Sequence, residues 1–156
     1  MLAATAQVRP GDIVVCSADG YMAAAVTGDL LVGMLKNAGA AALVTDAPIR
    51  DQDGVDGVGL PVFHGGVTPN SPASVGPGQI GLPIICGGVR VESGDIIVGD
   101  RDGVVVIPQA QAETVRARLE RVRAAESKLE ARVKDGLTVP DPIVDLLANG
   151  HIDWRD

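Results

Sequence analysis

Apolar residues along this chain fall into short runs that are typical of strands, separated by turn residues. The continuously apolar run 40–44 predicts a buried strand in a sheet that is covered on both faces. A β-branched run at 13–15 follows a Pro-Gly-Asp turn and predicts another strand. Further strands are predicted at 60–63, 82–86, 89–91, 96–98 and 104–107, with glycine-rich turns around them, including one at 55–59.

Helical spacing occurs in two places. Leu30, Leu31, Met34 and Leu35 predict a helix that begins near Gly28 or Asp29 and ends near residue 39. A much longer helix is predicted from Pro108 to about residue 135. Its apolar seam consists of Val115, Leu119, Val122, Leu129 and Val133.

Glu126 interrupts this apolar seam. A carboxylate at a seam position is costly unless it is paired, hydrogen-bonded or facing water. Two interpretations remain open. Either the seam is short and Glu126 is solvated, or Glu126 points into a site, such as one on a neighbouring subunit.

So many short strands favour a layered β/β/α domain over a doubly wound sheet. We expect one domain over residues 1–136, including the long helix. Residues 137–156 should form a linker, a short helix at 143–148 and a tail whose Trp154 is docked.

Composition narrows the function classes. The 156 residues are 46% hydrophobic with only three aromatic side chains, and the net charge is −7, which argues against nucleic-acid binding. No apolar run is long enough to span a membrane and no basic, then apolar leader begins the chain, so we expect a cytoplasmic protein. Cys16 and Cys86 stand alone, which favours structural thiols over a disulfide or a zinc site.

The strongest candidate chemistry follows the buried run 40–44. Arg50 can hold a carboxylate with its two-pronged guanidinium, and Asp51 can hold a divalent metal, with Asp53 two positions on. The alternative is a solvated turn with a local ion pair. Asp29 lies one helix and one strand earlier, and a strand-helix-strand unit can bring a helix start and the next strand's end to one cleft.

Asp29 itself has two interpretations. Near the helix start, its side chain can cap free backbone N–H groups. Alternatively, those N–H groups and Gly28 form a site for a small carboxylate. His64 has no second His or Cys beside it, which favours a hydrogen-bonding role over that of a general base.

Taken together, the motifs resemble the RraA-like / 4-hydroxy-4-methyl-2-oxoglutarate aldolase family over residues 8–136. The segments that carry this resemblance are Gly28-Asp29-Leu30, Ile49-Arg50-Asp51, Leu60-Pro61-Val62-Phe63, Gly66-Val67-Thr68-Pro69, Cys86-Gly87-Gly88-Val89 and the run from Asp102 to Pro108.

The resemblance implies a β/β/α swivelling-type α/β domain that assembles as a homo-trimer, sometimes paired to a hexamer, with the site at the subunit interface. It also implies a class II aldolase that uses Mg²⁺ or Mn²⁺. Such enzymes cleave 4-hydroxy-2-oxo diacids to pyruvate and a second 2-oxo acid, and decarboxylate oxaloacetate. No lysine is needed, so a Schiff base is not implied.

The resemblance also implies residue roles. Arg50 matches the pyruvate-binding arginine and Asp51 the metal ligand. Asp29 and Gly28 match the position beside the substrate, where backbone amides near Leu30 and Leu31 would take the carboxylate. Either Asp29 or Glu126 would orient a metal-bound water that moves protons.

Glu126 matches the glutamate that the long helix offers to the neighbouring subunit's site. A shift of the alignment would place Glu130 there instead.

Two departures from the family pattern bear on function. The Arg-Asp-x-Asp form at Arg50 to Asp53 is closer to the regulator branch, which binds a ribonuclease and need not be catalytic. The chain also begins where members of the family are already under way, so we expect an N-terminally short form.

Overall fold

The computed structural model describes residues 1–72 and 76–150. Contacts within the chain divide it into two compact units, Met1–Ala112 and Glu113–Asp156. The helices of the first unit are α1 (Leu2–Thr5), α2 (Asp29–Asn37), α3 (Gln52–Val58) and the 3-10 turn η1 (Gln109–Gln111). Its strands are β1 (Ile13–Cys16), β2 (Ala42–Thr45), β3 (Pro48–Ile49), β4 (Val62–Phe63), β5 (Gly66–Val67), β6 (Ile84–Cys86), β7 (Val89–Val91), β8 (Ile96–Gly99) and β9 (Val104–Ile107). The second unit holds α4 (Ala112–Lys134), which starts at the boundary, and α5 (Asp141–Ala148).

A parallel sheet of order β1-β2-β4 lies at the centre of the first unit. Its middle strand β2 is buried at every position, which confirms the strand predicted from the apolar run 40–44. Leu43 pairs with Val14 on one side and Val62 on the other. The two-residue strand β4 lies at the sheet edge, as a strand that begins beside Pro61 is expected to.

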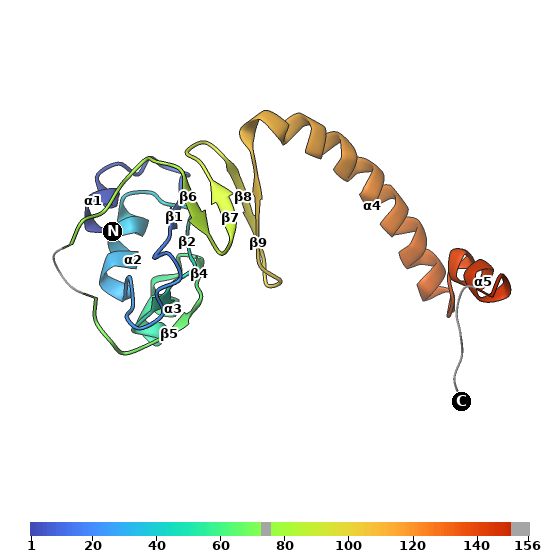
Figure 1. Ribbon diagram of the computed structural model, residues 1–156, viewed down its shortest axis with the longest axis horizontal. Helices are drawn as coiled ribbons and strands as arrows, with labels where there is room; N and C mark the ends of the chain where they lie inside the picture. Colours follow the sequence, from blue (N-terminus) through green and yellow to red (C-terminus); the bar gives the residue numbers. More distant parts are fainter. Residues whose placement is uncertain (73–75, 151–156) are drawn as a thin grey trace. The chain divides into compact units, whose positions relative to one another are not determined.

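Different layers cover the two faces of this sheet. Leu43 packs into a core formed with Val32 and Leu35 of α2 and Val55 of α3. The next residue, Val44, points the other way and lines a cavity that β7, β8 and β9 close. Within the first unit, Figure 1 shows α1 and α2 on one side of the parallel strands and the hairpins on the other. This arrangement is the β/β/α layering predicted from the sequence.

Two antiparallel hairpins, β6-β7 and β8-β9, form the second β layer. In the second hairpin Ile96 pairs with Ile107 and Gly99 with Val104. The backbone N–H of Asp100 donates to the carbonyl of Gly103 at 3.0 Å and closes the turn. The hairpin turn that the Asp-Gly pair predicted is therefore confirmed.

The prediction of a glycine-rich turn at 55–59 is wrong. Residues 52–58 form helix α3, and only Gly59 adopts the left-handed conformation that ends it. Val55 is 2% exposed in the core, so burial against α2 outweighs the low helix propensity of the two glycines inside α3.

The buried face of α2 also differs from the expected spacing. Val32 and Leu35 are fully buried, whereas Leu30 is 76% exposed and Met34 48%. The helix itself runs over Asp29–Asn37, which confirms its predicted position.

The second unit is built on charged helices. The seam residues Leu119, Val122, Leu129 and Val133 of α4 are exposed. Arg132 reaches Asp141 at the start of α5 at 2.9 Å. Within residues 1–72 and 76–150, no helix is long and apolar enough to cross a membrane. The predicted docking of Trp154 lies outside the described residues.

The Asp46 carboxylate ties the sheet layers together just after β2. It accepts hydrogen bonds from Ser17 Oγ at 2.9 Å, the Ala18 N–H at 3.0 Å and the Gly87 N–H at 3.2 Å. Burial alone would raise the pKa of Asp46, but these donors hold the pKa below its ordinary value. One carboxylate therefore joins the ends of β1 and β2 to the β6-β7 turn.

We predict that Asp46→Asn lowers the free energy of unfolding by about 1–3 kcal/mol at pH 7, because an amide accepts these bonds less well than a charged carboxylate. The pKa of Asp46 is lowered on folding, so its stabilisation is full above the unfolded pKa of about 4 and is lost as the pH falls through the folded value. Urea unfolding should show the difference between the proteins shrinking at acid pH. The exposed Asp102→Asn is the control, and an equal loss in both variants would contradict the prediction.

Gly65 allows the loop after β4 to lie against the backbone of Asp46. A Cβ there would overlap the carbonyl oxygen of Asp46 and lie 2.9 Å from its carbonyl carbon. We predict that Gly65→Ala destabilises the fold by about 1–3 kcal/mol. Gly57→Ala in α3 meets nothing within 4 Å and should be neutral or mildly stabilising. Thermal unfolding of the two variants measures the contrast, and similar melting temperatures would refute it.

Candidate functional site

Arg50 and Asp51 leave the core directly after β3. Ile49 is fully buried, and β3 is held on both sides, by Thr27 on one and by β5 on the other. The Arg50 N–H donates to the carbonyl of Thr27 at 3.0 Å. The two charged residues are thus fixed where the short buried strand β3 reaches the surface, whereas the sequence had placed them after the run 40–44, which forms β2 and ends at Thr45.

Asp51 adopts the left-handed conformation, with φ 56° and ψ 45°. It is the residue before α3, and its carbonyl accepts the N–H of Val55 at 2.9 Å. Residues other than glycine rarely take this conformation, although Asp tolerates it better than most. Such local strain is concentrated at functional sites.

The side chains of Arg50 and Asp51 form an ion pair that is open to solvent. Arg50 Nε lies 3.2 Å from Asp51 Oδ2, and the two side chains are 39% and 46% exposed. At this exposure the pair itself contributes at most about 1 kcal/mol to stability. Both groups remain accessible to a ligand.

Gly28 allows the start of α2 to lie against this pair. A Cβ on Gly28 would overlap Asp51 Oδ2 and lie 3.0 Å from Arg50 Cγ. Any side chain at position 28 would therefore displace one of the charged groups. The predicted approach of the α2 start to the end of β3 occurs through this glycine.

Asp29 follows at the first turn of α2 and is half-buried. A Cβ on Gly54 of α3 would lie 2.7 Å from Asp29 Oδ2, so a second glycine makes room for the Asp29 carboxylate. Asp29 Oδ1 accepts the Leu30 N–H at 2.7 Å. One of the amides expected to take a substrate carboxylate therefore already has a partner in the protein, while the predicted role of Leu31 stays a prediction.

Ser71 is a contact of Arg50 that the sequence did not indicate. Arg50 Nη1 donates to Ser71 Oγ in the loop after β5. The sequence around Ser71 holds only turn residues and carries no periodic signal. This contact arises from the fold alone.

The other predicted residues do not join this cluster. Asp53 is exposed on the first turn of α3. Glu126 is exposed on α4 in the second unit, and its role stays a prediction. His64 lines a different cavity, and its Nδ1 is buried with no hydrogen-bond partner among the described residues.

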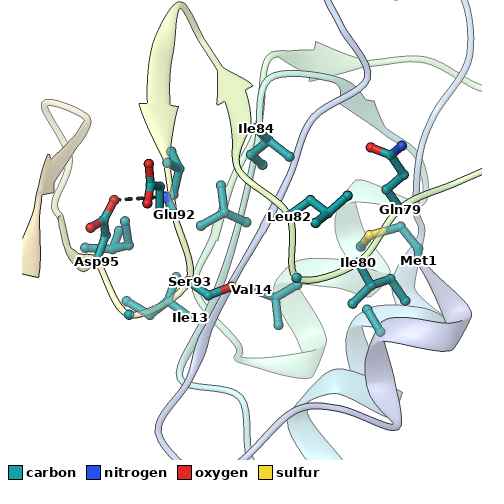
Figure 2. A pocket seen from close by; sticks show the side chains of 16 residues that line it. Met1, Ile13, Val14, Gln79, Ile80, Leu82, Ile84, Glu92, Ser93 and Asp95 are labelled. Atoms are coloured by element: carbon teal, nitrogen blue, oxygen red, sulfur yellow. Dashed lines mark hydrogen bonds between the residues drawn. The ribbon is translucent and has the colours of Figure 1, made fainter.

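Two cavities of the first unit lie away from Arg50 and Asp51. One of about 230 Å³ is lined by Ile80, Leu82 and Ile84 together with β1 and the turn at Glu92 to Asp95 (Figure 2). The other, of about 460 Å³, lies between the parallel sheet and the hairpins. The lining of this second cavity is mainly apolar, which does not suit a charged substrate.

Cys16 and Cys86 are both free thiols, as predicted. Cys86 Sγ lies 3.7 Å from the carbonyl oxygen of Cys16. Burial raises the pKa of each thiol, and the nearby Asp46 carboxylate adds to the shift at Cys86. Raised pKa values mean little thiolate at neutral pH, which fits a structural role.

Comparison with known proteins agrees with this fold and with the predicted motifs. A protein of Halalkalibacterium halodurans that bears the provisional name 4-hydroxy-4-methyl-2-oxoglutarate aldolase is 38% identical over 137 residues, which is 88% of this chain and 65% of that protein. The chain thus spans less than two thirds of the length of this curated relative.

Solved structures of similar fold include an unusual member of the RNase ES inhibitor RraA protein family from Streptomyces coelicolor. It is 32% identical with a TM-score of 0.78, over 84% of this chain and 67% of that one. An uncharacterized protein from Pseudomonas syringae pv. tomato is 28% identical with a TM-score of 0.74, over 85% and 67% of the two chains.

A family model described as RraA-like, Aldolase/RraA, matches residues 1–106. The match takes in every residue of the cluster at Gly28, Asp29, Arg50, Asp51 and Ser71. This chain belongs to the RraA-like (Aldolase/RraA) family.

Proposed function

We propose that this protein is a metal-dependent carbon–carbon lyase that releases pyruvate from a 4-hydroxy-2-oxo diacid or from oxaloacetate. The observation that carries the proposal is the exposed Arg50–Asp51 pair, held against a glycine whose missing side chain leaves room for both charged groups. A mere surface ion pair needs neither a left-handed Asp nor a glycine packed against it. The provisional aldolase name of the Halalkalibacterium halodurans relative supports the same reaction class.

The residues present fit a magnesium-type ion better than a closed metal site. The described part of the chain holds no cluster of three or more His, Cys, Asp or Glu side chains that could bind a metal. Zinc sites need such a cluster, whereas Mg²⁺ keeps several waters and takes one or two carboxylates. Asp51 is the carboxylate that would hold Mg²⁺ or Mn²⁺ here.

The chain's own groups have clear tasks in this reaction. The Arg50 guanidinium binds the carboxylate beside the 2-oxo group and holds the substrate in a fixed orientation. In oxaloacetate, the bond between C3 and C4 breaks, CO₂ leaves, and the electron pair forms the enolate of pyruvate. A divalent ion held by Asp51 would supply Lewis-acid stabilisation of that enolate.

A proton must then reach C3 to give pyruvate. Asp29 stands at the α2 start beside the pair and can orient a water for this transfer. We propose that Glu126 of a neighbouring copy takes part in the same step, in a homo-trimer with the site between subunits. This role follows from the family resemblance and from the seam position of Glu126 in α4.

We predict that Arg50→Ala and Asp51→Ala each lower kcat/KM for pyruvate release by about 100-fold or more, because Arg50→Ala removes the group that binds the substrate carboxylate and Asp51→Ala removes the carboxylate that would hold the metal. A lactate-dehydrogenase-coupled assay on oxaloacetate, with and without EDTA, measures this. The chain's other Arg-Asp pair offers matched controls, Arg101→Ala and Asp102→Ala, which should keep wild-type rates. Full activity in the Arg50 and Asp51 variants would show that the site is assigned wrongly.

A second candidate is a non-catalytic regulator that binds a ribonuclease. Asp53 favours this candidate, because the Arg-Asp-x-Asp pattern that it completes is closer to the regulator branch of the family. The Streptomyces coelicolor neighbour, described as a member of an RNase ES inhibitor family, favours it too. A regulator of this kind would act through a surface that contacts the ribonuclease, and it would need no bound metal.

If the regulator function is correct, the purified chain should retain an RNase E-type ribonuclease in a pull-down that is unaffected by EDTA. It should also slow cleavage of an RNA oligonucleotide, with no pyruvate release from oxaloacetate. Arg50→Ala should leave this binding unchanged. Ribonuclease that elutes in the wash, together with metal-dependent pyruvate release, would exclude the regulator reading.

A further inference from the structure

The guanidinium of Arg50 has contacts on two of its nitrogens. Arg50 Nε lies 3.2 Å from Asp51 Oδ2, and Arg50 Nη1 donates to Ser71 Oγ. A single contact leaves a guanidinium free to swing about its long stem, whereas contacts on two nitrogens fix its plane. In the described part of the chain, no hydrogen bond or ion pair uses Nη2. The Nη2 side of the guanidinium is therefore available to bind a ligand.

Ser71 reaches Arg50 because its loop is fastened to other segments. The Thr68 N–H donates to the carbonyl of Ile49 at 2.9 Å. Asn70 Nδ2 donates to the carbonyl of Ala23 at 3.0 Å, and the carbonyl of Asn70 accepts the Ala25 N–H at 2.9 Å. The Thr68 bond continues the pairing of β5 with β3, and the two Asn70 bonds fasten the loop to the segment at Ala23 and Ala25. The place of Ser71 is therefore set by the fold.

We propose that Ser71 is a positioning residue that orients Arg50 for the carboxylate of a 2-oxo acid. The inference rests on the proposed lyase function. An arginine side chain loses rotamer freedom when a carboxylate binds it in a fork. Ser71 and Asp51 restrict the guanidinium before the substrate arrives, so the substrate carboxylate meets an oriented partner. The hydroxyl of Ser71 accepts from Arg50 and keeps its own proton to donate.

Loss of the hydrogen bond between Ser71 and Arg50 should affect KM and kcat differently. Orientation of Arg50 acts on the carboxylate in both the bound substrate and the transition state, because that carboxylate does not react. Loss of uniform binding of this kind raises KM and leaves kcat unchanged. A role of Ser71 in loop structure alone would instead lower the amount of folded protein.

The test is steady-state pyruvate release from oxaloacetate by the full chain with Mg²⁺. Ser71→Ala should raise KM by roughly tenfold, as expected for a lost hydrogen bond to a charged group, with kcat within about twofold. Ser71→Thr keeps the hydroxyl and should restore KM. Ser93→Ala, an exposed serine in another turn, should match the wild type in KM. An unchanged KM in Ser71→Ala, or a Thr variant as impaired as the Ala variant, overturns the inference.

A double-mutant cycle shows whether Ser71 acts through Arg50. In an Arg50→Ala background, Ser71→Ala should cause no further change in the affinity for oxalate, measured by calorimetry. An additional loss there would mean that Ser71 acts independently of Arg50, which contradicts the proposal.

The two proposals can fail separately. If the wild type shows no turnover but binds oxalate, and Ser71→Ala weakens that binding, the lyase function fails and the positioning role stands. If turnover is metal-dependent and Ser71→Ala is kinetically normal, only the positioning role fails. A wild type that neither turns over oxaloacetate nor binds oxalate overturns both.

Discussion

The close approach of α2 to the end of β3 is the contact on which the candidate site depends. It exists because residue 28 has no side chain, so that a helix start can lie against Asp51 and the stem of Arg50. A methyl group there would displace the Asp51 carboxylate or the Arg50 side chain. With the contact in place, Gly28 at the start of α2 lies against the Arg50 and Asp51 side chains, which stand between β3 and α3, while the Asp29 carboxylate lies against Gly54 of α3.

The rest of the first unit keeps that contact in register. Buried β2 sits in the middle of the parallel sheet, and α2 and α3 bury Val32, Leu35 and Val55 against it. Between β2 and β3, Asp46 joins the strand ends to the second β layer through three accepted hydrogen bonds. A carboxylate with a lowered pKa is a charged anchor, so this junction is strongest at neutral pH. The site is held by a rigid frame rather than by its own ion pair.

The site at Arg50 and Asp51 is open to solvent and is not enclosed in a pocket. Neither cavity of the first unit includes Arg50 or Asp51, and both charged side chains are partly exposed. An exposed pair binds a carboxylate weakly on its own, because water screens each charge. Chemistry at this surface therefore gains from groups that orient Arg50, such as Ser71, and from a subunit partner that would exclude water, as in the proposed homo-trimer.

Local pattern alone determined much of this protein. The apolar run at 40–44, the helix start at Asp29 and the Asp-Gly hairpin could all be predicted from the sequence, because burial and turn chemistry act between near neighbours. Tertiary structure alone decided the rest. Helix α3 forms over a glycine-rich stretch because Val55 is buried in the core. The contacts of Gly28 and Ser71 with Arg50 join residues about twenty positions apart, and no local pattern encodes a contact between segments that meet only after folding.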